Sequence, residues 1–136
     1  MSTAITFSEI WKYPDDHAGI TIPTVLGYGN RIVTATAKID TGAEYCLFDR
    51  DYGERLGLTI EEGFPLSLET LTGTLDAFGH EVTIQTLGLS FQSVIYFSRY
   101  AGLPRNLLGR NGWLRNIRLA VIDYDNQVFL SNYEDA

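Results

Sequence analysis

The chain has 136 residues, of which 45% are hydrophobic and 20% are charged. This length and composition are typical of one globular domain with a sizeable core, so we expect a single domain over residues 1–136. A formal net charge of −7 argues against a nucleic-acid partner, because phosphates would be repelled. No apolar run reaches about 18 residues, so we expect no transmembrane helix and no membrane partner.

The single cysteine, Cys46, excludes an internal disulfide and a multi-cysteine metal site. The start of the chain has neither a basic head nor a long apolar stretch, and so differs from a signal peptide. Both features predict a reducing, cytoplasmic setting. Cys46 lies between Tyr45 and Leu47 in an apolar run, which indicates a buried structural thiol rather than a nucleophile.

The first half of the chain alternates strand-like runs with turn residues. Residues 20–27 and 31–39 flank a glycine turn at 28–30, which predicts a hairpin. Residues 44–48 predict a short buried strand. Residues 49–58 carry acidic residues early and an arginine and a glycine late, which predicts a helix of one or two turns.

The second half continues the same pattern. Residues 65–91 predict three strands, with the first turn at Thr72-Gly73, and residues 93–97 predict a further strand. Residues 103–117 combine an apolar run, a glycine turn and a short helical pattern. Two strands at 118–124 and 127–131 form a final hairpin. These elements predict an all-β fold, a closed or folded-over barrel with one or two short helices.

Neither histidine belongs to a recognisable catalytic or metal-binding pattern. Asp15-Asp16-His17 lacks a third ligand type at a sensible spacing, and we expect no metal site and no cofactor. His80 follows Phe78-Gly79, which indicates a strand edge or a turn.

Asp40 is the remaining candidate for chemistry. It follows the apolar lead-in Ala37-Lys38-Ile39 and opens the tetrapeptide Asp40-Thr41-Gly42-Ala43. An aspartate in a tight turn commonly caps nearby backbone amides, and the tripeptide D-T-G alone favours that structural role. A carboxylate at the bend between two buried segments is costly, however, unless it is hydrogen-bonded or functional.

A second segment, Leu107-Leu108-Gly109-Arg110-Asn111, lies well downstream of the first. With both motifs in this order and at this spacing, the chain resembles the retropepsin-like aspartic proteases, the single-domain relatives of pepsin. The resemblance covers residues 22–131, approximately. It implies that Asp40 is catalytic, and that the segment containing Leu108, Gly109 and Arg110 packs against its turn.

The resemblance implies an active site shared by two chains. Peptide hydrolysis in this family needs two carboxylates, one to activate water and one to protonate the carbonyl oxygen. The chain has only one D-T-G, so the second aspartate would come from another copy in a C₂ homodimer. Thr41 would then bond across the dimer, and Gly42 would let the backbone approach the carboxylates. Ala43 lacks the hydroxyl that other members use at that position.

The resemblance also implies supporting parts. Arg110 would pair with Glu44, and a hairpin around Leu71-Thr72-Gly73-Thr74 would form a flap over the substrate, with Phe78-Gly79-His80 as a rival bend. Dimers of this family are usually closed by terminal strands, for which residues 127–131 are the candidate.

The predicted function is an aspartic endopeptidase acting on an extended peptide through an activated water, without a cofactor. A second class stays open at this point, since a fold alone does not establish a function. It is a catalytically weak or inactive dimeric protein that binds peptides or acts as a scaffold on the same fold. The intact D-T-G-A favours the enzyme.

Overall fold

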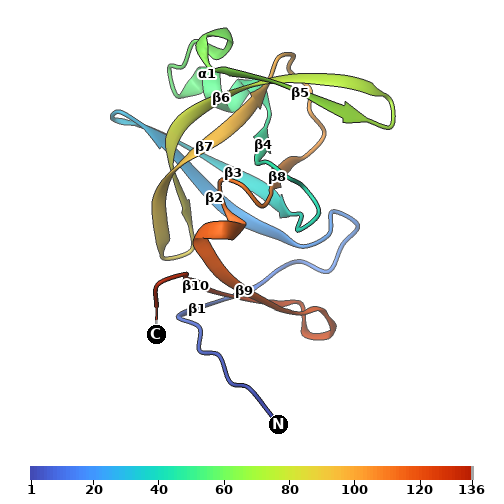
Figure 1. Ribbon diagram of the computed structural model, residues 1–136, viewed down its shortest axis with the longest axis vertical. Coiled ribbons are helices and arrows are strands. Elements are labelled where there is room, and N and C mark those ends of the chain that lie inside the picture. The colour runs from blue at the N-terminus through green and yellow to red at the C-terminus, as the bar shows by residue number, and fades with distance from the viewer. Residues whose placement is uncertain (136) are drawn as a thin grey trace.

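Two adjacent strands, β2 (Thr21–Tyr28) and β3 (Arg31–Ile39), form the antiparallel hairpin that the sequence predicts. The structure is a computed structural model, and it describes residues 1–135 (Figure 1). Gly29 at the turn has a φ of 60°, a left-handed conformation that costs glycine little.

Six strands close into a barrel in the order β2-β3-β8-β4-β7-β6, and β6 returns to pair with β2. The later members are β4 (Leu47–Phe48), β6 (Gly73–Thr86), β7 (Leu89–Ser98) and β8 (Asn106–Leu108). β8 lies parallel to β3 and antiparallel to β4, so a late segment is inserted between two early ones. The prediction of an all-β closed barrel is confirmed.

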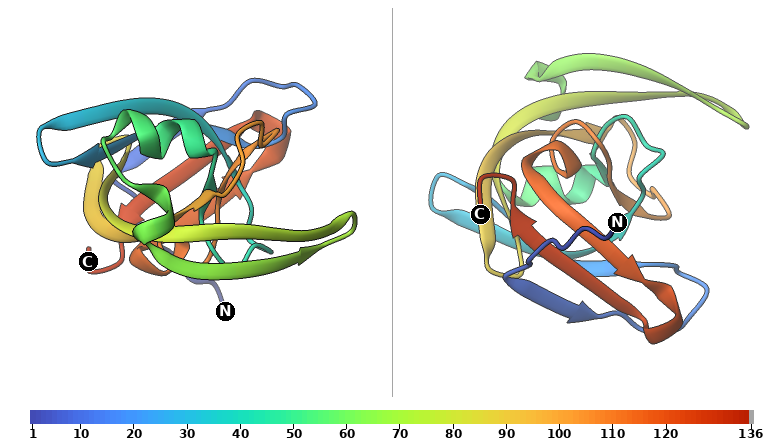
Figure 2. Two further views of the ribbon diagram at one scale, coloured as in Figure 1. Left: turned by 90° about the horizontal axis from the view of Figure 1, so that it is seen from above. Right: turned by 60° about the horizontal axis from the view of Figure 1, so that its bottom comes forward.

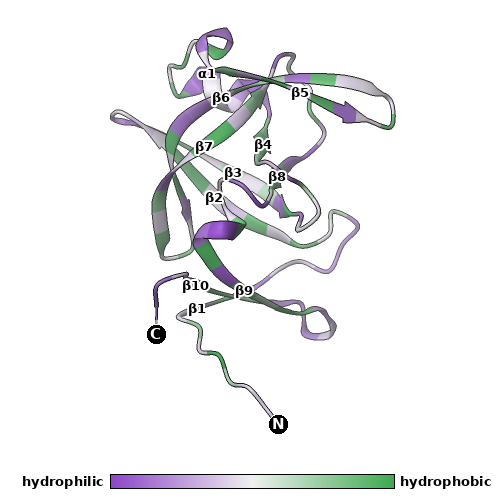
Figure 3. Ribbon diagram, viewed as in Figure 1, coloured by the Kyte–Doolittle hydropathy of each residue, from purple (hydrophilic) through white to green (hydrophobic). Residues whose placement is uncertain are grey.

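Hydrophobic and hydrophilic residues alternate along the long strands of the barrel (Figure 3). The hydrophobic set points inward and forms one buried cluster, which includes Ile22, Leu26, Val33, Ala37, Val82, Ile84, Ile95, Phe97, Leu108 and Trp113. Trp113 is fully buried, and its Nε1–H donates to Thr86 Oγ1 at 3.1 Å, so the polar end of the ring is satisfied. This packing makes the barrel a rigid support for its loops.

A second, three-stranded sheet joins the two ends of the chain in the order β1-β10-β9. Its strands are β1 (Glu9–Lys12), β9 (Ile117–Ile122) and β10 (Gln127–Asn132). The predicted final hairpin is confirmed as β9–β10, and η3 (Asp123–Asp125), a one-turn 3-10 helix, lies between its strands.

This topology changes the expectation for residues 127–131. β10 is the central strand and pairs with β1 on one side and β9 on the other, so its backbone cannot add a strand from a second chain. The reason is β1, a strand that the sequence does not predict. Within the described residues, the open edges of this sheet belong to β1 and β9.

Tyr13 fastens the segment after β1 to this hairpin. Its backbone N–H donates to Asn126 O at 3.0 Å, and its hydroxyl donates to Asp123 Oδ1. The side chain is buried, with 4% exposed. Burial, together with the bond to Asp123, raises the pKa of Tyr13 to about 12.

The predicted short helix is α1 (Arg50–Arg55), and the carboxylate of Asp49 caps it by accepting from Asp51 N at 3.1 Å. Gly53 lies inside the helix at its contact with the barrel. A Cβ there would be 2.5 Å from Ile60 Cδ1 and 3.0 Å from the Phe97 ring, so the absence of a side chain permits the close packing. Two 3-10 turns, η1 (Ile60–Glu62) and η2 (Leu114–Asn116), complete the helical elements of residues 1–135.

Three expectations differ from the structure. The separate strand at 93–97 is wrong, because residues 89–98 form the single strand β7, paired with β6 along its whole length. The strand at 44–48 is shorter than expected, since only Leu47–Phe48 joins the sheet and the residues before it bond to another loop. The bend at 78–80 is wrong, because β6 continues through it. In the part of the chain described, no helix has the length and apolar character needed to cross a membrane.

Candidate active site

Asp40 lies where β3 ends and the chain turns away from the barrel. Its backbone N–H donates to Leu108 O at 3.0 Å, which continues the β3–β8 pairing by one residue. Its carbonyl oxygen accepts from Ala43 N at 3.1 Å, and its carboxylate Oδ1 accepts from Gly42 N at 3.0 Å. The residue therefore caps its own turn, as the structural interpretation of the tripeptide predicts.

The other carboxylate oxygen of Asp40, Oδ2, has no hydrogen-bond partner among the described residues. The side chain is half-buried. Thr41 and Gly42 beside it are exposed, and Ala43 is half-buried. The turn thus holds the half-buried carboxylate by one oxygen, beside two exposed residues, Thr41 and Gly42.

The second motif lies directly behind this turn, as the resemblance implies. Arg110 N donates to Ala43 O and Asn111 N donates to Glu44 O, both at 2.9 Å. Gly109 has no room for a side chain, because a Cβ would be 2.3 Å from Tyr45 O and 2.7 Å from Ala43 O. The two segments are therefore held together by backbone contacts that require glycine at position 109.

Glu44 and Arg110 do not form the expected ion pair in the described structure. Both side chains are exposed, and an ion pair between exposed groups stabilises a protein by only about 0–1 kcal/mol. The backbones of the two residues supply the link between the segments instead.

Cys46 supports the two segments from the inside. It is fully buried, and Gly109 N donates to its Sγ at 3.3 Å. Burial raises the pKa of the Cys46 thiol to about 12, so the sulfur stays protonated and unreactive near neutral pH. The prediction of a buried structural cysteine is confirmed.

The hairpin expected around Leu71–Thr74 is present. β5 (Phe64–Thr70) pairs with the first half of β6, and Leu71 and Thr72 form the turn between them. Figures 1 and 2 show this hairpin extending beyond the barrel, on the side where the segment between β3 and β4 lies. A hollow of about 330 Å³ separates its tip from residues 98–104.

His80 lies in the middle of β6, opposite Ile95 of β7, and not at the strand edge or turn that the sequence predicts. It is half-buried, and its Nε2 lies 2.9 Å from Ile60 O. The preceding Phe78-Gly79 is misleading because Gly79 packs beneath the Tyr96 ring, where a Cβ would be 2.8 Å from Tyr96 Cε1. Among residues 1–135, no group of three or more His, Cys, Asp or Glu side chains could hold a metal ion.

Comparisons with known proteins identify the fold. No protein-family model matches the chain, and no curated protein matches it. Among solved structures, a retropepsin-like aspartic protease from Rickettsia conorii covers 90% of this chain and 97% of its own, with 16% identity and a TM-score of 0.65. The EIAV protease in complex with an inhibitor covers 66% of this chain and 80% of its own, with 19% identity and a TM-score of 0.51. The chain therefore has the fold of the retropepsin-like family.

Proposed function

We propose that this protein is an aspartic endopeptidase whose catalytic carboxylate is Asp40. The observation that carries the proposal is the carboxylate geometry. Oδ1 accepts a hydrogen bond from Gly42 N at 3.0 Å, while Oδ2 has no hydrogen-bond partner among the described residues. A carboxylate held in this way can orient and deprotonate a water molecule, which would be the nucleophile.

One carboxylate cannot serve as base and acid in the same step, so the proposal requires a second Asp40 from another copy of the chain. A two-fold axis beside Asp40 would bring the two turns together. The exposed Thr41 and Gly42 would then lie at the contact, where small residues permit the approach of two backbones. Two carboxylates brought together at this axis would repel each other if both were ionised, so the pair would share one proton.

The substrate in this proposal is an extended peptide that binds between the aspartates and the β5–β6 hairpin. Extended peptides bind through strand-like backbone hydrogen bonds, and the hairpin offers a strand edge. The hairpin would act as a lid that excludes water from the reacting bond. No cofactor takes part. A cytoplasmic location stays a prediction that rests on the single cysteine.

The test compares wild type with Asp40→Asn on a peptide library from acid to neutral pH, with Asp51→Asn as the control. Asp51 is an exposed carboxylate on α1, and among residues 1–135 it forms one ion pair, with Arg55. We expect Asp40→Asn to lower the cleavage rate at least about a hundredfold, and Asp51→Asn to leave it unchanged. Equal cleavage by wild type and Asp40→Asn would refute the assignment.

Analytical ultracentrifugation of the same samples tests the stoichiometry. We expect cleavage to increase with the square of protein concentration below the dimer dissociation constant, and a strictly monomeric active protein would contradict the shared site. If the wild type bound peptides without cleaving them, the alternative function, an inactive peptide-binding protein, would be supported instead.

A further inference from the structure

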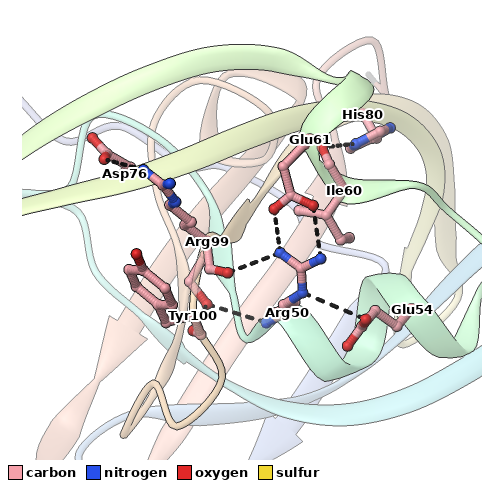
Figure 4. A network of polar contacts seen from close by, with 9 residues as sticks. Arg50, Glu54, Ile60, Glu61, Asp76, His80, Arg99 and Tyr100 are labelled. Carbon is pink, nitrogen blue, oxygen red and sulfur yellow. Dashed lines mark hydrogen bonds and ion pairs between the residues drawn. The ribbon is translucent and has the colours of Figure 1, made fainter.

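The β5–β6 hairpin leaves the barrel at a defined place. Residues Gly73–Asp76 of β6 pair only with β5, and pairing with β7 begins at Ala77 opposite Ser98. Beyond that point no further strand of the described chain pairs with the hairpin, so its direction depends on contacts at its base. These contacts form a polar network around Arg50, Glu61, Arg99 and Asp76 (Figure 4).

Arg50, the first residue of α1, is the centre of this network. Its Nη2 donates to Glu61 Oε1 at 2.7 Å, and its Nη1 donates to Glu61 Oε2 and, at 2.8 Å, to Arg99 O. Its Nε lies 3.4 Å from Glu54 Oε2. The planar guanidinium suits this two-point contact with a carboxylate, and lysine could not make all of these bonds at once.

Two of the partners of Arg50, Glu61 and Arg99, connect it to the two strands at the base of the hairpin. Glu61 belongs to η1, which leads directly into β5. Arg99 bonds to β6, because its backbone N–H donates to Asp76 O at 2.9 Å and its Nη1 lies 3.5 Å from Asp76 Oδ2. Asp76 Oδ1 also accepts from Ser67 Oγ of β5 at 2.8 Å. One guanidinium therefore connects the helix to the segment that leads into β5 and, through Arg99, to Asp76 of β6.

The members of the network differ in strength. The Arg99–Asp76 pair is exposed, with 49% and 40% of the side chains accessible, so that ion pair alone stabilises little. The Arg50 side chain is only 22% exposed and makes a bidentate contact with Glu61, whose side chain is 49% exposed, so its two-point geometry distinguishes this pair more than burial does. The hydrogen bonds of this contact lower the pKa of Glu61 and raise that of Arg50, so the contact favours the charged form of both groups.

We propose that Arg50 is a positioning residue that sets the equilibrium between closed and open positions of the β5–β6 hairpin. The effect of Arg50 on the position of the hairpin is inferred from geometry alone. Its effect on cleavage rests, in addition, on the proposed function. Removal of the guanidinium leaves Arg99 O and Glu61 without their common partner. The segments that Arg50 connects at the base of the hairpin then separate, and the hairpin has more open positions to occupy.

Hydrogen exchange tests the geometric half of the proposal in the full-length protein. The variants are Arg50→Met, which keeps the aliphatic stem, and Glu61→Gln, which keeps the side-chain size. The matched control is Arg55→Met on the same helix, since Arg55 contacts Asp51 and Tyr52 but not the hairpin. We expect amide exchange in residues 64–76 to rise about fivefold in Arg50→Met and Glu61→Gln, and to stay unchanged in Arg55→Met.

Steady-state kinetics on a peptide that the wild type cleaves tests the catalytic half. In the proposal, bound substrate favours the closed hairpin, so saturating substrate closes it in the variants as well. We therefore expect Arg50→Met and Glu61→Gln to raise KM about fivefold and to leave kcat within about twofold of the wild-type value. A lower kcat at constant KM would indicate a smaller folded fraction and would overturn the proposal. Wild-type-like exchange in both Arg50→Met and Glu61→Gln would also overturn it. Absence of activity in the wild type would refute the proposed function, while exchange would still decide the role of Arg50.

Discussion

Gly109→Ala is the substitution that most directly probes the contact between the two loops of the site. The added Cβ would lie 2.3 Å from Tyr45 O, whereas carbon and oxygen atoms approach each other to about 3.3 Å in proteins. The two backbones must therefore separate by about 1 Å. The neighbouring bonds from Arg110 N to Ala43 O and from Asn111 N to Glu44 O, now 2.9 Å long, would then exceed hydrogen-bonding distance.

The expected loss of stability follows from these bonds. Each contributes about 1 kcal/mol, and overpacking adds about 1–3 kcal/mol, so we expect the free energy of unfolding to fall by about 3 kcal/mol. For a chain of this length, that loss lowers Tm by roughly 10 °C. Urea denaturation and a thermal melt at one fixed protein concentration measure both quantities, because dimerisation would make Tm depend on concentration.

Gly42→Ala is the matched control, because it lies in the same pair of loops. A Cβ there would be 3.4 Å from Asp40 Oδ1, an ordinary contact, so we expect a change below about 1 kcal/mol. A Gly109→Ala protein as stable as wild type would refute the reasoning. So would an equal loss in both variants, since the effect would then be a general cost of alanine in these turns.

Two further substitutions test other parts of the structure. Tyr13→Phe removes the hydroxyl that donates to Asp123, and we expect a loss of about 1–2 kcal/mol in urea unfolding at pH 8. Because the pKa of Tyr13 is raised to about 12 from 10.0, this stabilisation is complete below pH 10 and is lost between pH 10 and 12, so a difference that persists at pH 12 would contradict it. Ala43→Ser places a hydroxyl in the Asp40 turn that can stabilise an ionised carboxylate, and we expect a more acidic optimum in the pH profile of kcat/KM; an unchanged profile would count against this role.

Local features of the structure are predictable from the sequence because they depend on neighbouring residues. Gly29 marks a hairpin turn, Asp49 begins a helix, and an apolar run on either side of Cys46 buries the thiol. The contact between the two motifs comes from the resemblance, and Gly109 shows its physical basis, since only a residue without a side chain fits against Tyr45 O.

Features that depend on distant residues are not predictable in this way. The strand β1 is only four residues long, and its partner β10 lies at the other end of the sequence, so no local pattern indicates the pair. Arg50 lies within the helix predicted at 49–58, and nothing in that local pattern indicates its partners outside the helix. Its contacts with Glu61 and Arg99 arise because α1 packs against η1 and β7, which lie far from Arg50 in sequence or beyond its own helix.

The pairing of Glu9–Lys12 with Gln127–Leu130 also has a consequence for synthesis on the ribosome. Translation produces β1 first, but β1 has no partner until β10 has left the exit tunnel. The parallel contact of β3 with Asn106–Leu108 imposes a similar delay on the Asp40 turn. Contacts between segments so far apart in sequence form slowly. The Asp40 turn of a nascent chain therefore lacks its backbone support until Asn106–Leu108 has emerged and paired with β3.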